Sequence, residues 1–570
     1  MEDLNKILEE ILPYVQTPAQ YIGGETNSVV KDPRSVDISF ALAFPDTYAI
    51  GMSHLGMQVL YSILNGRDDI AAERVFSPWP DMEGEMRKRG IPLFSLETRR
   101  PIREFDIVGF SLQYEICYTE MLRMLDLAGI PPLASERAET DPLIIAGGPC
   151  AFNPEPVADF LDAILIGDCE QTVLTFVDTL KAARREGAPR KELLRRIAQA
   201  HGSFYVPSLY ETSYNADGTI AAMTPRGGAP PTVAKAIVEN LDDAPAPTAP
   251  IVPYVEIIHD RIAIEIMRGC PSGCKFCQAA RVKRPVRTRS LDGIMAIARE
   301  AYKNTGYDEI ALVSLSSSDY PDFTNLLAKI SAEFAPLCVN ISLPSLRVTE
   351  QLRDLPRYLN QVRKSGLTLA PEAATDTLRQ TLNKRVDNED LYAAALEAYR
   401  QGWDLIKLYF MIGLPEEKKE DIDAIAEMTA KVSTLRRQTN KGPGRVNASI
   451  STFVPKPFTP LERVRMIDIE RTREIQRYLR QKVRSRKINL KFHNAERSFL
   501  EGVFSRGDRR LSPVLLAAYG KGCKLDSWDE MFRFDLWKQA FAECGVDPNF
   551  YAMRERSADE ILPWSFITHD

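Results

Sequence analysis

Three cysteines close together are the residues in this sequence whose types and spacing most clearly suggest chemistry. Cys270, Cys274 and Cys277 stand at C-x3-C-x2-C spacing inside the glycine-rich, basic stretch RGCPSGCKFCQAARVKRP. A structural zinc ion takes four protein ligands, and the candidates for a fourth, His259 and Cys338, are not in a second close pair. An iron–sulfur cube held by three thiolates leaves one iron open to bind a small molecule. The spacing therefore favours an iron–sulfur cluster with an open iron over zinc or plain buried thiols.

The composition is that of a globular protein with several domains. The 570 residues exceed one ordinary core and suggest about three to four domains. Hydrophobic residues make up 44% and charged residues 26%, and no apolar run is long enough to span a bilayer, so we expect no membrane association. The N-terminus, MEDLNKILEEILPYV, predicts an acidic amphipathic helix and lacks the features of a secretory signal, so we expect a cytoplasmic protein with reduced thiols. Nine cysteines, mostly scattered, argue against a disulfide framework.

Buried-strand runs alternate with helical patterns through residues 36–200. The runs DISFALAF, DIVGFSL, DPLIIAGGP and DAILIGD predict a doubly wound parallel sheet with helices on both faces, as in Rossmann or flavodoxin-like domains. A helical extension over residues 1–35 precedes it. Residues 201–250 begin with a predicted hairpin that turns at Asn215 to Gly218, and continue as a linker rich in proline and alanine.

A second alternating series fills residues 251–462. AIEIM, EIALVSL, CVNISL, GLTLA, LIKLYFM and VNASIST are separated by amphipathic stretches of helix length and predict a partial (β/α)6 barrel of the TIM type. Residues 463–570 predict a small mixed domain, basic at first and helical later. Active sites of such barrels lie at the C-terminal ends of the strands, which is where the three cysteines follow AIEIM.

The cysteine motif with Phe276 before its last cysteine, at the end of the first barrel strand, resembles that of the radical S-adenosylmethionine (SAM) superfamily. The resemblance implies an enzyme with a 4Fe-4S cluster on Cys270, Cys274 and Cys277, whose open iron binds SAM. It also implies that an external one-electron reductant of the flavodoxin or ferredoxin type reduces the cluster. SAM is then cleaved to a 5'-deoxyadenosyl radical, which abstracts hydrogen from a substrate.

Candidate SAM-binding residues follow the later barrel strands, and the resemblance assigns their roles. Three serines stand where the family often has Gly-Gly-Glu; they could bind the methionine amine, or form only a polar loop. Polar residues after the third strand could meet the carboxylate, an acidic residue after the fourth resembles the one near the ribose, and an apolar glycine turn after the fifth could pack on adenine. With Phe276, the candidates are Ser316, Ser317, Ser318, Ser342, Ser345, Arg347, Glu372, Ile412, Gly413 and Leu414.

A doubly wound domain ahead of such a barrel resembles the cobalamin (B12)-binding branch of the superfamily, and nearly the whole chain resembles one subgroup with no agreed substrate. A corrinoid needs a crevice at strand ends, small residues and backbone donors. Tyr48 stands where the D-x-H-x-x-G pattern of cobalamin mutases has histidine, and we expect nearby His54 to cap or pack instead of ligating cobalt. The alternative is a flavodoxin-like domain without the cofactor. The candidate cobalamin-binding residues are Tyr48, Gly51, Ser111, Gly147 and Gly148.

A basic stretch from Arg463 to Lys491 reverses the acidic balance of the chain, whose net charge is -6. With Arg506, Arg509 and Arg510, it could grip RNA phosphates. A solvated helix face that pairs with acidic neighbours is the commoner outcome for such a run. The sequence contains no RNP or KH signature, so RNA is the less favoured partner.

The leading hypothesis is a radical SAM enzyme that carries out cobalamin-dependent methyl transfer to an unactivated carbon. One alternative is cobalamin-independent radical SAM modification of RNA. Another is a non-catalytic iron–sulfur protein for electron transfer or sensing. The substrate, small molecule or macromolecule, is not identified, and no residue is assigned to the substrate step.

Overall fold

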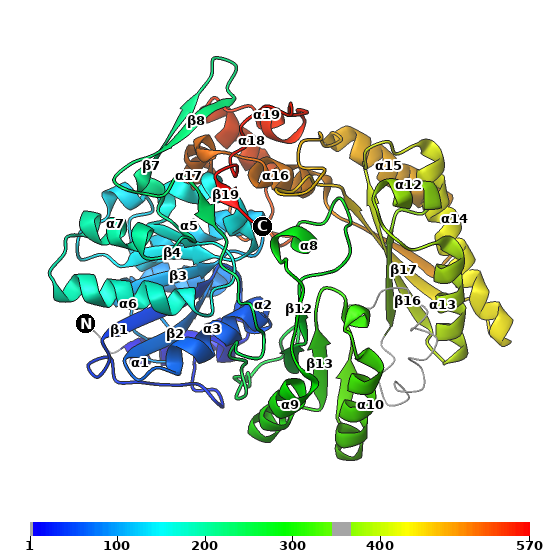
Figure 1. Cartoon of the computed structure of the whole chain (residues 1–570), viewed down its shortest axis with the longest axis horizontal. Helices are drawn as coiled ribbons and strands as arrows, with labels where there is room; N and C mark the ends of the chain where they lie inside the picture. Colours follow the sequence, from blue (N-terminus) through cyan, green and yellow to red (C-terminus); the bar gives the residue numbers. More distant parts are fainter. Residues whose placement is uncertain (1–3, 345–365, 570) are drawn as a thin grey trace.

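The structure is a computed structural model that describes residues 4–344 and 366–569, and it has an α/β architecture. In Figure 1 the N-terminal sheet and its helices lie on the left, and the barrel strands and their helices lie on the right. The C-terminal helices lie across the top. The fold class is the predicted one. None of the described helices is both long and apolar enough to cross a membrane.

The N-terminal sheet has the strand order β2-β1-β3-β4-β5-β6, in which all pairs are parallel except β5 with β6. The reversal of order between β1 and β3 creates the edge at which flavodoxin-like sheets bind ligands. Four strands confirm the predicted runs, whereas β2 was not predicted. The strands are β1 (Ile38–Phe44), β2 (Ile70–Phe76), β3 (Ile107–Ser111), β4 (Leu143–Gly147), β5 (Ala163–Leu165) and β6 (Phe204–Tyr205).

Strand β2 is hidden in the sequence because charged residues interrupt its apolar run, although every residue in it is buried. Arg74 lies between two buried carboxylates, with Nη2 2.7 Å from Glu25 Oε2 and Nε 2.6 Å from Glu97 Oε1. The neighbouring Glu73 accepts hydrogen bonds from Ser95 at 2.6 Å and from the backbone of Thr98 at 3.1 Å. Pairing with distant residues therefore allows the charges of this strand to be buried.

Helices connect the strands of the N-terminal sheet, and a separate helix starts the described chain. Helix α1 buries Leu8 and Ile11 and confirms the predicted amphipathic segment. The helices are α1 (Leu4–Ile11), α3 (Leu55–Asn65), α4 (Pro80–Arg89), α5 (Tyr118–Ala128), α6 (Thr172–Arg185) and α7 (Arg190–Ala200).

The six predicted barrel strands are present, but they form two parallel sheets instead of one. Strands β10, β13 and β14 pair with one another, and β15, β16 and β17 pair with a further strand, β18. Among the described residues these sheets do not close into a barrel. The strands are β10 (Ile262–Glu265), β13 (Glu309–Val313), β14 (Asn340–Ser342), β15 (Leu367–Glu372), β16 (Leu405–Ile412), β17 (Arg445–Thr452) and β18 (Ile488–Phe492).

The strand β18 lies in the basic C-terminal stretch and was not predicted. Its residues alternate between half-buried and exposed. The strand therefore has no run of buried apolar residues that would mark it in the sequence. Helices α9 (Leu291–Thr305), α10 (Phe323–Phe334), α13 (Asn388–Arg400), α14 (Lys419–Leu435) and α15 (Ile469–Lys482) accompany the barrel strands.

The segment between the two sheets contains the predicted hairpin and linker. Strands β7 (Tyr210–Tyr214) and β8 (Ile220–Pro225) confirm the hairpin. In the linker, β9 (Val233–Ala234) pairs in parallel with β19 (Ile567–Thr568) near the C-terminus. The linker is therefore fastened by residues from the far end of the chain.

Lys456 joins the segment after β17 to the N-terminal sheet and to a C-terminal helix. Its Nζ lies 2.8 Å from Glu115 Oε1 and 2.8 Å from Glu501 Oε1. Glu501 belongs to α16 (Ala495–Ser505), which Tyr114 also reaches by donating its hydroxyl to Glu501 Oε2 at 2.9 Å. Three parts of the chain therefore share one buried polar contact.

We predict that Arg74→Ala lowers the free energy of unfolding by roughly 3–5 kcal/mol, because it leaves Glu25 and Glu97 buried without their cation. Urea unfolding followed by circular dichroism would measure the change. The control is Arg34→Ala, which removes the exposed pair with Asp32 and should leave the midpoint unchanged. Equal effects of the two substitutions would contradict the importance of burial.

Candidate functional site

The cysteine loop hangs from a short antiparallel ribbon at the end of the first barrel strand. Strands β11 (Met267–Arg268) and β12 (Arg287–Thr288) form this stem, with Arg268 opposite Arg287. Gly269 follows the stem with φ +88°, and a Cβ there would lie 2.8 Å from the carbonyl oxygen of Lys283. Glycine is therefore required where the loop leaves the ribbon.

The far side of the loop is held by the segment that follows β15. The backbone N–H of Lys275 donates to the carbonyl of Leu382 at 3.0 Å. The side-chain amide of Asn383 donates to the carbonyl of Gly273, also at 3.0 Å. Both partners lie just after α12 (Asp376–Thr381), so the loop is positioned by the stem at one end and by the barrel at the other.

The three cysteines share one environment within this loop. Cys270 and Cys274 are buried and Cys277 is half-buried. Burial raises the pKa of Cys277, and the neighbouring Cys274, Cys270 and Glu372 raise it further. The thiols are therefore close enough to influence one another, and a bound cation would be needed to hold them as thiolates.

The cysteine loop carries further polar groups beside its thiols in the sequence. Within the described ranges, no three His, Cys, Asp or Glu side chains converge where one metal ion could sit. A mononuclear zinc site would need sulfur atoms about 2.3 Å from one point. Ser272 Oγ and Arg281 Nε, on the same loop, are buried without hydrogen-bond partners among the described residues. The assignment of the three thiols to an iron–sulfur cluster stays a prediction.

Glu372 ends β15 in an unusual conformation. The register of β15 against β16 shifts between Leu369 and Glu372, and Glu372 has φ +68°, which is uncommon for a residue other than glycine. Burial raises the pKa of Glu372, and the nearby Lys384 opposes that rise. Lys384 Nζ lies 3.8 Å from its Oε1, a partner that sequence reasoning missed. Together with its effect on Cys277, this places Glu372 at the edge of the cysteine loop.

An apolar cluster lies between the cysteine loop and the barrel strands. Phe276 packs with Leu414, Leu382 and Phe453 in it, so two predicted SAM-binding residues are brought together. Ile412 instead faces the barrel core. The apolar cluster gives this end of the barrel a surface suited to an aromatic ring.

The glycine turn after β16 is held by a carboxylate that sequence reasoning missed. Gly413 has φ +80°, and its N–H donates to Glu417 Oε2 at 2.8 Å. Burial raises the pKa of Glu417 to about 7; the Gly413 N–H opposes this and Asp421 adds to it. Glu417 is therefore a group at the barrel mouth that ionises near neutral pH.

The three serines after the second barrel strand are buried, and two of their hydroxyls bond within their own loop. Ser316 Oγ donates to Asp319 Oδ2 at 2.6 Å, and Ser317 Oγ donates to the carbonyl of Leu312 at 3.2 Å. Ser318 is buried beside them. The polar-loop interpretation accounts for these contacts, and backbone groups are left as the better candidates for a ligand.

The predicted residues after the third strand are placed only in part. Ser342 Oγ accepts a hydrogen bond from Arg261 Nη1 at 3.3 Å, and Arg261 also pairs with Glu309 at 2.8 Å. Ser345 and Arg347 lie outside the described residues. A contact between Arg347 and the methionine carboxylate stays a prediction.

A cavity of about 320 Å³ opens at the C-terminal edge of the N-terminal sheet. Three predicted cobalamin-binding residues line it: Ser111, Gly147 and Gly148. Cys169 and His54 belong to the same wall. Its barrel-side wall consists of Glu265, Arg268 and Lys283, which belong to the first barrel strand and the cysteine loop. The cavity therefore lies between the two halves of the molecule, against the base of the cysteine loop.

Two predicted cobalamin residues lie away from this cavity. The hydroxyl of Tyr48 donates to Glu25 Oε1 at 2.8 Å inside the core. Gly51 packs so closely against Phe76 that a Cβ would overlap the ring. Their spacing matched a cofactor motif, but Tyr48 serves a buried hydrogen bond and Gly51 a close packing contact.

His54 confirms the prediction of a capping residue. Its Nδ1 accepts the N–H of Met57 at 3.3 Å at the start of α3. Burial lowers the pKa of His54, a hydrogen bond with Gln113 opposes this, and Lys283 adds to it. The imidazole is therefore a neutral, engaged part of the cavity wall.

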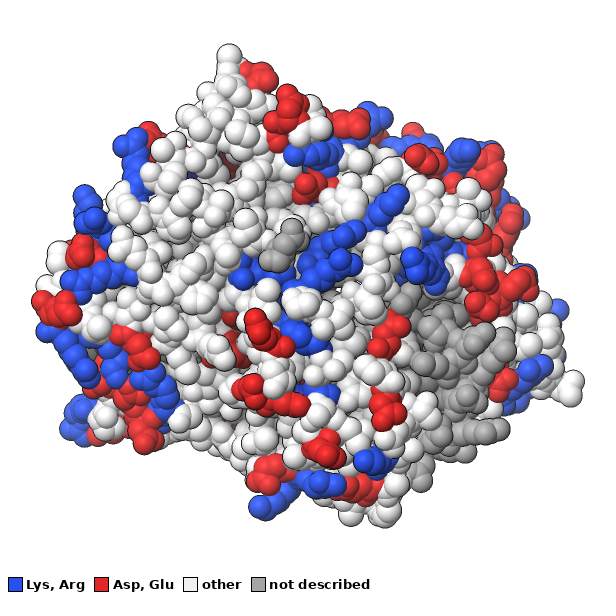
Figure 2. Space-filling model, viewed as in Figure 1, with Lys and Arg blue, Asp and Glu red and all other residues white. Residues whose placement is uncertain are grey.

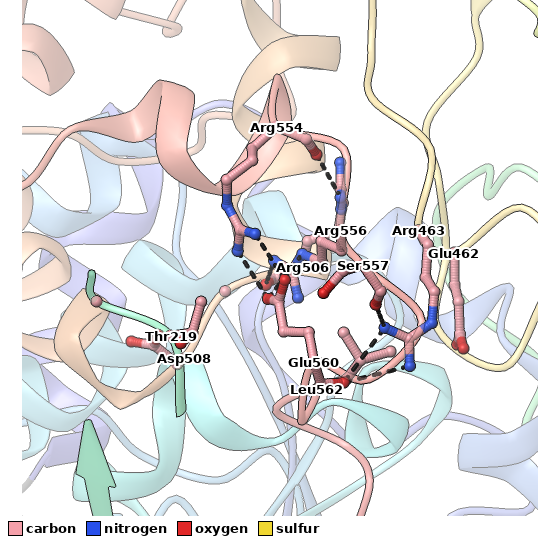
Figure 3. Close-up of polar contacts among 12 residues, drawn as sticks. Thr219, Glu462, Arg463, Arg506, Asp508, Arg554, Arg556, Ser557, Glu560 and Leu562 are labelled. Carbon is pink, nitrogen blue, oxygen red and sulfur yellow. Dashed lines mark hydrogen bonds and ion pairs between the residues drawn. The ribbon is translucent and has the colours of Figure 1, made fainter. Parts of the chain in front are cut away.

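The arginines near the C-terminus are engaged within the fold, which agrees with the commoner interpretation of the basic stretch and not with the less favoured one of RNA contacts. Arg506 is 0% exposed and donates to the carbonyls of Ala552 and Arg554, both at 2.9 Å. Figure 3 shows Arg506, Arg554 and Arg556 around Glu560, with Arg554 Nη1 2.6 Å from its Oε2. Burial, reinforced by Arg556, lowers the pKa of Arg506 to about 9.

The two arginines that follow Arg506 are engaged in the same way. Arg509 Nη2 donates to the hydroxyl of Tyr205 at 2.7 Å, and Arg510 pairs with Asp508 at 2.6 Å. For Arg506, Arg509 and Arg510, positive charge in the sequence therefore did not indicate an exposed basic patch.

The basic helix α15 is paired in part with acidic neighbours, as the commoner interpretation of the basic stretch expects. Arg471 pairs with Glu474 at 3.1 Å and Arg473 with Glu470 at 2.8 Å. Lys482 pairs with Asp423 on α14. The helix is a solvated face whose charges are partly neutralised within the fold.

Lys and Arg side chains gather instead across the middle of the face in Figure 2, over the position of α8 (Ala279–Val282) in Figure 1. Arg281 belongs to α8 and is half-buried, as is Lys283, whereas Arg284, two residues after the helix, is exposed. The cysteine loop therefore contributes basic residues to this part of the molecule.

Comparison with family models finds two matches along the chain. A model described as "Radical SAM proteins, N-terminal" matches residues 56–207. A model described as "Radical SAM superfamily" matches residues 264–429, which include the cysteine loop, β15 and β16. The two matches together span more than half of the chain.

Similar proteins cover the chain to different extents. "Uncharacterized protein MJ0966" of Methanocaldococcus jannaschii is 28% identical over 479 residues, which are 83% of this chain and 90% of that protein. "Ribosomal protein uS12 methylthiotransferase RimO" of Pelotomaculum thermopropionicum is 24% identical over 238 residues, 38% of this chain and 51% of that protein. The radical S-adenosylmethionine methyltransferase TsrM of Kitasatospora setae, solved with cobalamin and a 4Fe-4S cluster bound, aligns with a TM-score of 0.50 at 12% identity. That alignment covers 76% of this chain and 75% of TsrM, and it shows a shared fold.

We predict that Glu417→Gln changes how stability depends on pH. The folded carboxyl, with pKa about 7, keeps a proton that the unfolded chain releases near 4.5, so the wild type loses stability as pH rises from 4.5 through 7. The variant lacks this loss. Its free energy of unfolding, relative to that of the wild type, should therefore increase with pH, by about 3 kcal/mol in total above pH 7. Urea unfolding at several pH values measures it, with the exposed neighbour Glu416→Gln as control. Parallel profiles for Glu417→Gln and wild type would contradict the prediction.

Proposed function

The chain belongs to the radical SAM superfamily, and we infer that it is an enzyme that transfers a methyl group, with the help of cobalamin, to an unactivated carbon of its substrate. The observation that carries the proposal is the cavity between the N-terminal sheet and the barrel. One wall comes from the strand ends of a flavodoxin-like sheet and the other from the cysteine loop. A cofactor held there would face the place where radical chemistry starts.

Membership of the superfamily implies a 4Fe-4S cluster and SAM. Cys270, Cys274 and Cys277 would hold the cluster, which supplies one electron to SAM when bound. The chain contributes the surroundings. Phe276 and Leu414 exclude water at the barrel mouth. Glu372, kept in place by Lys384, offers carboxylate oxygens to hydroxyl groups.

Cobalamin fits the cavity in part. A volume of about 320 Å³ suits a small ligand or one portion of a large one, such as the nucleotide tail of a corrinoid. Glycines 147 and 148 keep side chains out of this space, and Ser111 offers a hydroxyl. Because His54 is engaged by Met57 and Gln113, we propose cobalamin binding without a histidine ligand to cobalt. TsrM, which shares the fold, was solved with cobalamin.

RNA modification without cobalamin is less well supported as a second function. Its support is the similarity of part of the chain to methylthiotransferases, one of them named for threonylcarbamoyladenosine tRNA. The burial of Arg506 and the internal pairing of Arg509 and Arg510 remove three of the candidates for phosphate contacts. A purely electron-transferring or sensing role does not suit a chain of this enzyme superfamily.

The basic residues of the cysteine loop support docking of an acidic electron donor. In that loop Arg284 is exposed, and Arg281 and Lys283 are half-buried. Opposite charge would steer a flavodoxin or ferredoxin to the surface nearest the cluster.

We predict that Cys274→Ala abolishes the cluster and, with it, reductive cleavage of SAM, because one of the three thiolates is lost. Iron content, visible absorbance and 5'-deoxyadenosine release after dithionite reduction would be measured in anaerobically reconstituted protein. Cys338→Ala, at an exposed cysteine, should match the wild type. Zinc in place of iron, or a cluster that survives Cys274→Ala, would refute the assignment.

We predict that the protein binds hydroxocobalamin, and that Gly147→Val weakens binding by at least about tenfold by filling the cavity. A Cβ at Gly147 would lie at ordinary contact distance, 3.5 Å from the carbonyl oxygen of Leu165, and its φ is not in the left-handed region. The substitution should therefore be tolerated by the backbone. Absorbance titration measures binding, with Gly202→Val, where a Cβ meets nothing within 4 Å, as control. Absence of corrinoid bands in the wild type would refute the cobalamin proposal.

A further inference from the structure

An acidic segment that follows the N-terminal sheet meets the basic stem of the cysteine loop. Asp168 and Glu170 follow β5, at the cavity edge of the sheet. Arg268 and Arg287 form the stem of the cysteine loop. Arg268 Nη1 lies 3.1 Å from Asp168 Oδ1 and its Nη2 lies 2.6 Å from Glu170 Oε1.

One carboxylate bridges both strands of the stem. Asp168 Oδ1 contacts Arg268 on β11, and Asp168 Oδ2 contacts Arg287 Nη1 on β12 at 2.6 Å. The stem register places these two arginines opposite each other. The loop that carries the cysteines is therefore closed at its base by a residue of the other sheet.

The bridge is buried and fully engaged. The side chain of Asp168 is 4% exposed, and those of Arg268 and Arg287 are 12% and 6% exposed. Asp168 Oδ2 also accepts the N–H of Val238 at 3.0 Å, and Arg287 Nη1 donates to the carbonyl of Val238 at 2.7 Å. A buried pair of this kind depends strongly on its geometry, because any displaced partner leaves a charge without compensation.

The same residues form part of the cavity wall. Asp168, Glu170, Arg268 and Lys283 all line the cavity, and Lys283 Nζ lies 3.8 Å from Asp168 Oδ1. A ligand in the cavity therefore touches the ion pairs that hold the stem.

We propose that Asp168 is a positioning residue that makes corrinoid binding in the cavity and the arrangement of the cysteine loop depend on each other. This inference rests on the proposed cobalamin function. Corrinoid bound in the cavity favours the loop geometry in which Asp168 contacts both Arg268 and Arg287. In the other direction, a cluster bound to the cysteine loop favours the positions of Arg268 and Lys283 in the cavity wall. By linkage the two effects must be equal in free energy.

The test is a cycle of four proteins titrated with hydroxocobalamin and followed by visible absorbance. Cluster-loaded wild type is compared with the cluster-free Cys270→Ala, Cys274→Ala, Cys277→Ala protein, and both are prepared again with Asp168→Asn. We expect the cluster to tighten hydroxocobalamin binding about tenfold when Asp168 is present, and to change it less than about twofold in the two proteins that carry Asp168→Asn. The cluster reduction potential, measured with and without hydroxocobalamin, should shift in the wild type and stay constant in Asp168→Asn.

Two further variants keep the result interpretable. Asp162→Asn is the matched control, because Asp162 is a buried aspartate paired with Arg137 and Arg190, both at 2.8 Å, and does not line the cavity. It should retain the coupling. Arg287→Lys keeps the charge but removes the guanidinium fork, and should reduce the coupling as Asp168→Asn does, so the outcome does not depend on the folding of one variant.

The outcomes separate the inference from the function on which it rests. Hydroxocobalamin that binds all four proteins of the cycle with the same affinity overturns the coupling and leaves cobalamin binding intact. Coupling that persists in both Asp168→Asn and Arg287→Lys overturns the role of Asp168. A wild type that binds no hydroxocobalamin overturns the proposed function and the inference together.

Discussion

Ion pairs buried between the N-terminal sheet and the barrel keep the C-terminal ends of two sets of parallel strands facing one space. Asp168 follows a strand of the first set, and Arg268 follows a strand of the second. Those ends are where both kinds of sheet bind ligands. Burial removes the charges from water, so each pair holds only while its partners stay in place. The cavity and the cysteine loop are thus positioned by the same contacts, and the candidate site needs both halves of the chain.

The strands could be predicted where burial leaves a continuous apolar run, as in β1 and β3, or a regular alternation with fully buried residues, as in β16 and β17. Strand β2 escaped because Glu73 and Arg74 interrupt its run, and the residues that compensate them, Glu25 and Glu97, are distant in sequence. Strand β18 escaped because it is half-exposed. A pattern of polarity along the chain records local burial, whereas a charge that is buried by pairing leaves no local trace.

The residues of the candidate site also differ in whether the local sequence could reveal them. The cysteine spacing and the glycines at the cavity edge were visible because each carries its own chemical or conformational signal. Tyr48 was chosen by its spacing to a motif, yet its hydroxyl serves the core. Arg506 was chosen by local charge, yet it binds backbone carbonyls. The pairs of Asp168, and the partnership of Glu372 with Lys384, depend on how loops meet in space, which no single stretch of sequence encodes.

The pairing of β9 with β19 has a consequence for how the molecule is assembled during translation. Ile567 lies beside Val233, and the backbone N–H of Lys235 donates to the carbonyl of Thr568 at 2.9 Å. The N-terminal sheet can form as it leaves the ribosome, since its strands are close in sequence. The strap between the two halves, however, must wait until residues 567–568 have been synthesised. Its fastening is therefore a late folding event of high contact order, which cannot precede the emergence of residues 567–568 from the ribosome.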